Sequence, residues 1–217
     1  TQPFPTKPPA YDRQGVSEDD LIDFTPELRA EALDRASNFL MGPIFTPPVV
    51  ADPDGPWGTL MLPSTGGGTN WPGGSVDPET GIFYQYSFTS LVSIGLVNDP
   101  ERSDMDFIRG NPPGIPARDR ALTIRGLPMV KPPWGRITAI DLKRGEIVWQ
   151  VAHGETPDNV REHPELQGVD IPRTGRVGRV GTLITKALVI AGEGGTFTTP
   201  SGELGAMLRA YDKATGE

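Results

Sequence analysis

Few residues of this 217-residue chain are of the types that carry out chemistry. The chain has no cysteine, which excludes disulfides, thiolate metal sites and cysteine nucleophiles. His153 and His163 are its only histidines, and neither has partners at the spacing of metal ligands. The acidic pairs at residues 19–20 and 52–54 lack the rest of a calcium loop. None of these residues predicts a catalytic centre by itself.

Three glycine-rich runs are the remaining candidates for binding. Residues 192–195 lack the Lys-Ser/Thr ending of a phosphate loop and predict an ordinary loop. Residues 175–179 carry two arginines, and either an anion site or a solvated loop fits them. The third run, residues 66–71, ends in Asn70 and Trp71. Spacing alone makes Asn70 a loop residue whose side chain satisfies turn amides.

The charge of the chain argues against partners that are polyanions. Its formal net charge is −8, and no run of Lys or Arg reaches four residues. Nucleic-acid binding without sequence preference needs a basic surface that neutralises phosphates, so this class is disfavoured, as are anionic membrane surfaces. Glycine and proline are abundant, with 27 and 24 residues, and apolar strands lie between their clusters. This composition indicates strands and turns with long loops.

One helix and a series of strands are expected to position these candidates. Residues 1–15 are rich in proline and predict an extended surface segment. Ser17 caps a short helical turn, and Thr25 caps a helix over residues 26–40 with an apolar stripe at helical spacing. A helical turn is also expected within residues 156–168. The predicted strands cover residues 58–62, 82–88, 91–97, 135–141, 146–151, 183–185, 188–191 and 206–211.

A turn motif occurs three times, at residues 76–81, 140–145 and 211–216. Each copy has an apolar residue, an Asp, two variable residues, then Thr or Arg144, and a Gly. This pattern is typical of a hairpin turn in which the Asp accepts hydrogen bonds from turn amides and the Gly takes a positive φ. The copies are further apart than the ~40–50 residues of a bare four-stranded unit, and inserted loops can supply the difference.

The repeated hairpins predict an all-β chain with the architecture of a partial β-propeller. Closing such a ring takes ~4–8 blades, and the chain has material for roughly three antiparallel blades. The third motif stops within its own turn, which suggests a piece of a larger protein. We expect a single incomplete propeller segment over residues 1–217, with a Pro-rich and helical insertion at 1–43 and blade strands at 44–217. Trp149 is expected to pack between blades.

Several of these runs resemble the quinoprotein dehydrogenases that use pyrroloquinoline quinone (PQQ). Residues 139–149 are similar to the tryptophan-docking motif of that family, with Arg144 in place of the usual Thr. Residues 67–71, followed by 76–81, resemble the run on the cofactor side. Residues 1–9, 19–28 and 132–139 look like the glucose dehydrogenase branch in particular. The resemblance extends over nearly the whole chain.

The resemblance implies an eight-bladed propeller that holds PQQ and Ca²⁺ in a central funnel. In this family an Asp acts as the base, and hydride passes from the substrate to the quinone. The Asn of the Asn-Trp pair hydrogen-bonds the quinone oxygens and corresponds to Asn70, while Trp71 would shape the pocket wall. The catalytic Asp, most calcium ligands and the Lys that polarises the quinone lie ahead of this chain, so no catalytic residue and no metal ligand is assigned in it.

The implied function is oxidation of a glucose-like sugar or an alcohol. Its partners would be the remaining blades of the same protein and an electron acceptor such as ubiquinone or cytochrome c. A periplasmic location follows from the resemblance, and attachment to the inner membrane through a preceding region stays open. The chain alone is expected to be inactive, to bind PQQ weakly or not at all, and to be poorly soluble. Two alternatives are a non-catalytic propeller scaffold that binds proteins and a carbohydrate-binding β module.

Overall fold

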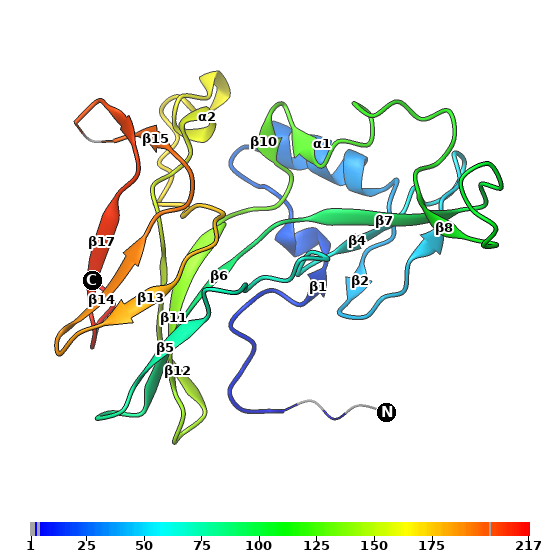
Figure 1. Ribbon diagram of the computed structural model, residues 1–217. Helices are drawn as coiled ribbons and strands as arrows, with labels where there is room; N and C mark the ends of the chain where they lie inside the picture. Colours follow the sequence, from blue (N-terminus) through cyan, green and yellow to red (C-terminus); the bar gives the residue numbers. More distant parts are fainter. Residues whose placement is uncertain (1–2, 4, 200) are drawn as a thin grey trace. The chain divides into compact units, whose positions relative to one another are not determined.

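The computed structural model describes residue 3, residues 5–199 and residues 201–217, and it divides into two compact units (Figure 1). Unit 1 consists of Thr1–Asp12, Gly66–Thr89 and Pro132–Glu217. Unit 2 consists of Arg13–Thr65 and Ser90–Lys131. The chain therefore leaves unit 1 and returns to it twice. The predicted division into residues 1–43 and 44–217 stays a prediction.

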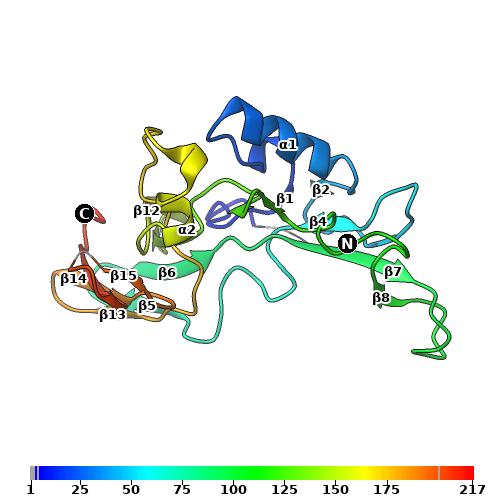
Figure 2. The ribbon, with the colours of Figure 1, turned by 90° about the horizontal axis from the view of Figure 1, so that it is seen from above.

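Unit 1 is built on a four-stranded antiparallel sheet with the order β12-β11-β6-β5. Its strands are β5 (Gly74–Asp77), β6 (Ile82–Phe88), β11 (Gly135–Asp141) and β12 (Glu146–Ala152). A second antiparallel sheet contains β13 (Thr182–Ile184), β14 (Leu188–Gly192) and β17 (Leu208–Asp212). Strand β13 lies beside β5 in both views (Figures 1 and 2). The smaller elements of unit 1 are α2 (Asp158–Arg161), a 3-10 turn (Pro164–Leu166), β15 (Phe197–Thr198) and β16 (Leu204–Gly205).

Unit 2 contains the long helix and several short strands. Its strands are β1 (Gly15–Val16), β2 (Gly42–Pro43), β3 (Val49–Val50), β4 (Thr59–Met61), β7 (Val92–Val97), β8 (Ile108–Gly110), β9 (Thr123–Ile124) and β10 (Leu127–Pro128). Strand β7 pairs with β4 and β8 in antiparallel orientation and with β3 in parallel. The β3–β7 pair departs from the antiparallel pattern that the sequence predicts.

The helix α1 (Pro26–Ala36) begins where the sequence predicts and ends earlier. Thr25 caps it, since its Oγ1 accepts a hydrogen bond from the Leu28 amide at 3.2 Å. The predicted end at Leu40 is wrong, because Leu40 leaves the helical path and bridges Thr59. The predicted stripe is nevertheless buried beyond the helix: Phe39 packs edge-on against Trp57 at 5.6 Å between ring centroids. Spacing therefore identified buried residues but not the helix end.

All three copies of the turn motif adopt the predicted geometry. In each copy the Asp carboxylate accepts a hydrogen bond from at least one turn amide, and the closing Gly has a positive φ; the pairs are Asp77 with Gly81 (79°), Asp141 with Gly145 (65°), and Asp212 with Gly216 (79°). The first two turns close hairpins of the same sheet, and the third follows β17. The motif thus marks successive hairpins, and one sheet can contain two copies.

The apolar face of the four-stranded sheet packs against the second sheet of unit 1. Its buried residues are Tyr84, Tyr86, Ile137 and Ala139, and they meet Val180, Val189, Ala191 and Tyr211. Trp149 joins this contact: its Nε1 donates to the Lys213 carbonyl at 3.2 Å, and its ring lies 5.6 Å from that of Tyr84. Trp149 thus contacts both sheets of unit 1, as expected for a residue that packs between blades.

The described elements confirm the predicted fold class. They are mostly strands in several small, largely antiparallel sheets, with few helices, as in a partial β-propeller. The sheets formed by the described residues do not close into a barrel. No helix in the described part of the chain is long and apolar enough to cross a bilayer.

Candidate functional site

Asn70 and Trp71 lie in the loop of unit 1 that leads into β5. The Asn70 Oδ1 accepts a hydrogen bond from the Trp71 amide at 2.8 Å, and the Asn70 carbonyl accepts one from the Gly73 amide at 2.9 Å. Asn70 therefore satisfies a turn amide, as its loop position alone predicts. This role occupies its Oδ1 and leaves the Nδ2 donor without a hydrogen bond among the described residues.

The loop offers one hydrogen-bond donor group and one exposed aromatic ring to a planar ligand such as a quinone. The Nδ2 group of Asn70 can donate to a quinone oxygen, and the same side chain is held by its other end on the Trp71 amide. The Trp71 side chain is 98% exposed, so its flat ring is accessible to a planar ligand. Asn70 and Trp71 therefore stay predicted cofactor contacts, and their accessible donor and ring are compatible with that prediction.

The glycine run before Asn70 is packed on a buried ion pair that the sequence did not reveal. The Gly68 carbonyl accepts a hydrogen bond from the Phe88 amide of β6 at 2.7 Å. A Cβ atom at position 68 would lie 1.5 Å from the Asp12 Oδ2, so only glycine fits there. Asp12 in turn pairs with Arg136 of β11. Their separation of 124 positions explains why no local motif marks the pair.

Both histidines make hydrogen bonds within unit 1. His153 is buried, and its two ring nitrogens face the Tyr211 hydroxyl at 2.9 Å and the Gly192 carbonyl at 3.0 Å. Burial lowers the pKa of His153, because removing the ring from water disfavours its charged form. His163 is half-buried and accepts a hydrogen bond from the Glu165 amide. Among the residues that the structure describes, no three His, Asp or Glu side chains gather as a metal site would require.

Each of the two other glycine-rich runs has one charged residue, Glu193 or Arg176, that contacts other parts of unit 1. In the run 192–195, Glu193 pairs with Arg209, which also contacts Glu155 at 2.5 Å. In the run 175–179, the Arg176 guanidinium lies 4.4 Å from the centroid of the Phe197 ring and donates to the Thr196 carbonyl at 3.0 Å. These contacts favour structural roles for Arg176 and Arg209.

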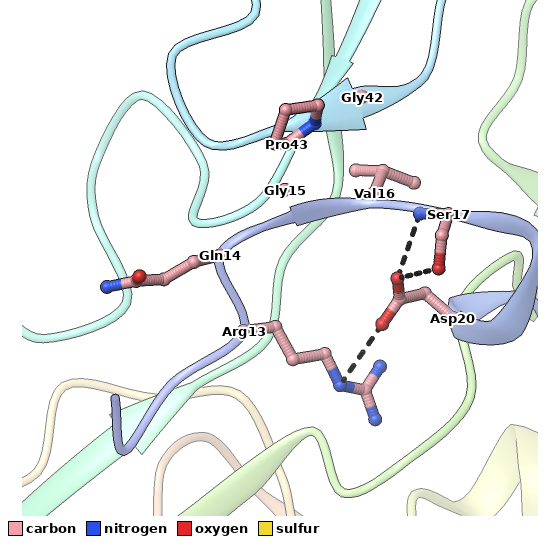
Figure 3. Close-up of a pocket in the computed structure, with 8 residues that line it drawn as sticks. All are labelled: Arg13, Gln14, Gly15, Val16, Ser17, Asp20, Gly42 and Pro43. Carbon is pink, nitrogen blue, oxygen red and sulfur yellow. Dashed lines mark hydrogen bonds and ion pairs between the residues drawn. The ribbon is translucent and has the colours of Figure 1, made fainter. Parts of the chain in front are cut away.

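A hollow of about 430 Å³ lies on unit 2, at the strands β1 and β2 (Figure 3). Its one carboxylate, Asp20, accepts hydrogen bonds from the Ser17 amide and hydroxyl at 2.9 and 3.0 Å. Arg13 lies 3.9 Å from the other oxygen of that carboxylate. Ser17 and Asp20 thus cap the turn at Glu18–Asp20, and the residues of this hollow belong to unit 2, whereas the Asn70 loop belongs to unit 1.

Comparison with known proteins gives consistent results. The chain is 28% identical over 240 residues to the glycerol dehydrogenase large subunit of Gluconobacter thailandicus, which covers 100% of this chain and 30% of that protein. It is 27% identical over 177 residues to a probable quinate dehydrogenase (quinone) of Xanthomonas campestris pv. juglandis, covering 73% of this chain and 20% of the relative. It is 32% identical over 131 residues to the quinoprotein glucose dehydrogenase of Escherichia coli K12, covering 54% and 16%.

The chain spans about 30% of the length of the glycerol dehydrogenase subunit. The PQQ family model, described as the glucose/ethanol/alcohol dehydrogenase β-propeller domain, matches residues 1–217. Together with the small antiparallel sheets, the three hairpin motifs and the docked Trp149, this match shows that the chain belongs to the β-propeller family of PQQ-dependent glucose, ethanol and alcohol dehydrogenases.

Proposed function

We propose that this chain forms part of the PQQ site of a dehydrogenase that oxidises a sugar or an alcohol. The observation that carries the proposal is the Asn70 side chain, whose Oδ1 is held by the Trp71 amide while its Nδ2 has no hydrogen bond to the residues that the structure describes. The exposed ring of Trp71 lies on the same loop. A scaffold that only binds proteins gives no reason for this combination, which disfavours the scaffold alternative.

Bound PQQ would supply the acceptor for the hydride equivalent that leaves the substrate. The proposed contribution of Asn70 is a hydrogen bond from Nδ2 to a quinone oxygen, where negative charge grows as the quinone is reduced. Trp71 would cover one side of the planar ring system and exclude water from it. The base, the Ca²⁺ ligands and the rest of the funnel are assigned to other parts of the protein.

The substrate class is proposed from the relatives. Their names refer to glycerol, quinate and glucose, which all carry several hydroxyl groups. We therefore place a polyhydroxylated sugar or alcohol ahead of a simple alkanol. Ubiquinone or cytochrome c as the electron acceptor and the periplasm as the location belong to the same proposal. Residues 1–217 alone are expected to show no dehydrogenase activity.

The test uses the full gene product, reconstituted with PQQ and Ca²⁺ and assayed with an artificial electron acceptor on glucose, glycerol, quinate and ethanol. Asn70→Asp keeps an oxygen for the Trp71 amide but removes the Nδ2 donor, whereas Asn70→Ala removes both. Both variants should lower turnover about 100-fold, as expected for the loss of one donor to a developing negative charge. The exposed loop residue Asn111 provides a matched control, and Asn111→Ala should leave turnover unchanged.

Two outcomes would contradict the proposal. Wild-type turnover in Asn70→Asp at saturating PQQ and Ca²⁺ would reduce Asn70 to a turn residue. A full gene product that takes up no PQQ would favour the scaffold alternative.

A further inference from the structure

The polar face of the four-stranded sheet in unit 1 contains a buried arginine. Arg136 of β11 is 3% exposed, and every nitrogen of its guanidinium is engaged. Its Nε donates to the Ser87 Oγ at 3.0 Å, its Nη1 to the Pro133 carbonyl at 3.2 Å, and its Nη2 to the Thr89 Oγ1 at 3.0 Å and to the Asp12 carboxylate. These contacts fix the guanidinium in one place, and with it the Asp12 carboxylate.

The Asp12 carboxylate lies directly against the backbone of the glycine run. Its Oδ2 occupies the space that a Cβ at position 68 would need, 1.5 Å away. On the other side, the Gly68 carbonyl is tied to β6 through the Phe88 amide. Residue 68 is therefore held between β6 and the ion pair, two positions before Asn70. Among the described residues, the hydrogen bonds of Asn70 and Trp71 are made within their own loop.

We propose that Arg136 and Asp12 are positioning residues that set the loop of Asn70 and Trp71 for the cofactor. The inference rests on the proposed function of that loop. An ion pair buried in a sheet is a weak source of stability, because desolvation offsets much of the attraction and apolar replacements are often as stable. A carboxylate paired with a guanidinium that three further hydrogen bonds hold does, however, define the position of the backbone that it touches. The Arg136–Asp12 pair therefore sets the position of the loop that carries Asn70.

A matched contact of the same N-terminal segment provides a control. Lys7 pairs with Glu146 at 3.3 Å, and both side chains are largely exposed. This contact holds the segment on the sheet without touching the glycine run. A variant that loses it should leave the loop in place.

The experiment measures the dissociation constant of PQQ for the metal-supplemented apo form of the full gene product, together with thermal stability. Gly68→Ala should weaken PQQ binding at least ~10-fold, because its Cβ displaces Asp12 or the loop. Asp12→Ala should weaken binding similarly. The double variant should bind no worse than Asp12→Ala alone, since the added methyl then meets no carboxylate; such non-additivity is the mark of coupled sites. Lys7→Ala should bind PQQ like the wild type.

A second comparison separates positioning from folding. Asp12→Ala/Arg136→Met removes both charges and should be as stable to heat as the wild type, or nearly so, while PQQ binding stays at least ~10-fold weaker. Wild-type PQQ affinity in this variant, or additive effects of Gly68→Ala and Asp12→Ala, would overturn the positioning role alone. A wild-type protein that does not bind PQQ would instead overturn the proposed function.

Discussion

Both faces of the sheet β12-β11-β6-β5 are buried, but one face carries apolar side chains and the other carries polar ones. Side chains of neighbouring residues in a strand point to opposite faces. One face carries Tyr84, Tyr86, Ile137 and Ala139, and the other carries Gln85, Ser87, Arg136 and Thr138. The difference lies in what covers them. A second sheet covers the apolar face, whereas backbone groups and charges of residues 7–12 meet the polar face.

The comparison shows that burial in this molecule serves two purposes. On the apolar face, packing fixes how two sheets join. On the polar face, hydrogen bonds fix where a loop and an N-terminal segment lie, as when the Gln150 Nε2 donates both to the Thr138 Oγ1 at 2.7 Å and to the Tyr11 carbonyl at 2.9 Å. Removal of a side chain should therefore affect stability most on the first face and ligand positioning most on the second.

The largest effect is expected for Ile137→Ala on the apolar face. Ile137 is fully buried between the two sheets, so the truncation leaves a cavity and loses packing. We expect the free energy of unfolding to fall by about 2–5 kcal/mol, measured by urea denaturation. Val148 on β12 is 42% exposed, and Val148→Ala should cost much less. Equal effects of the two variants would show that the apolar face is not the packed one.

The second effect is a pH dependence of the free energy of unfolding, which arises from His153 next to the apolar face. Burial lowers the pKa of His153 below 6.5 in the folded protein, while the unfolded residue takes up a proton near 6.5. The stability from neutral His153 is thus fully present above that pH and is lost as pH falls toward the folded pKa. The slope should not exceed about 1.4 kcal/mol per pH unit, the value for one proton. His153→Gln should have a flatter stability profile between pH 6.5 and 5; an unchanged profile would contradict this assignment.

A smaller effect is expected for Thr138→Val on the polar face. The side chains are similar in shape, but valine cannot accept the hydrogen bond from the Gln150 Nε2. That nitrogen keeps the Tyr11 carbonyl as a partner, so we expect a loss of about 1 kcal/mol in the free energy of unfolding. Urea denaturation of this variant beside Ile137→Ala compares adjacent, equally buried positions. A larger loss at Thr138 than at Ile137 would reverse the comparison.

The smallest effect is expected for Lys7→Ala. The Lys7 and Glu146 side chains are 64% and 49% exposed, so water screens their attraction. The free energy of unfolding should change by less than about 0.5 kcal/mol, and added salt should remove even that difference. A loss in the free energy of unfolding that persists in 1 M salt would mean that Lys7 stabilises the fold through contacts other than this ion pair.

The sequence was sufficient for the parts of the fold that depend on local pattern. Strands β6 and β11 have the predicted bounds, since alternation and β-branched or aromatic residues mark them clearly. The three Asp–Gly turns follow from the chemistry of the turn itself. Two-residue strands such as β1 and β3 were missed because partners far along the chain define them.

The candidate site was only partly accessible from the sequence. The motif located Asn70 and Trp71, and the structure adds that the Asn70 side chain is held through its Oδ1 by the Trp71 amide. Arg136 and Asp12 could not be paired in advance, because neither has a charged neighbour at a helical or strand spacing. Their pairing follows from the course of the chain in unit 1.

The turn that contains Lys213 follows β17 and connects the two sheets of unit 1. Its carbonyl accepts hydrogen bonds from the Tyr84 hydroxyl at 3.1 Å and from the Trp149 Nε1 at 3.2 Å, and its Nζ lies 2.8 Å from the Asp77 carboxylate. This ammonium group lowers the pKa of Asp77 to about 2. A shift of β17 by one residue would break all three contacts at once. The contacts of Lys213 thus favour the correct register of β17 over registers shifted by one residue.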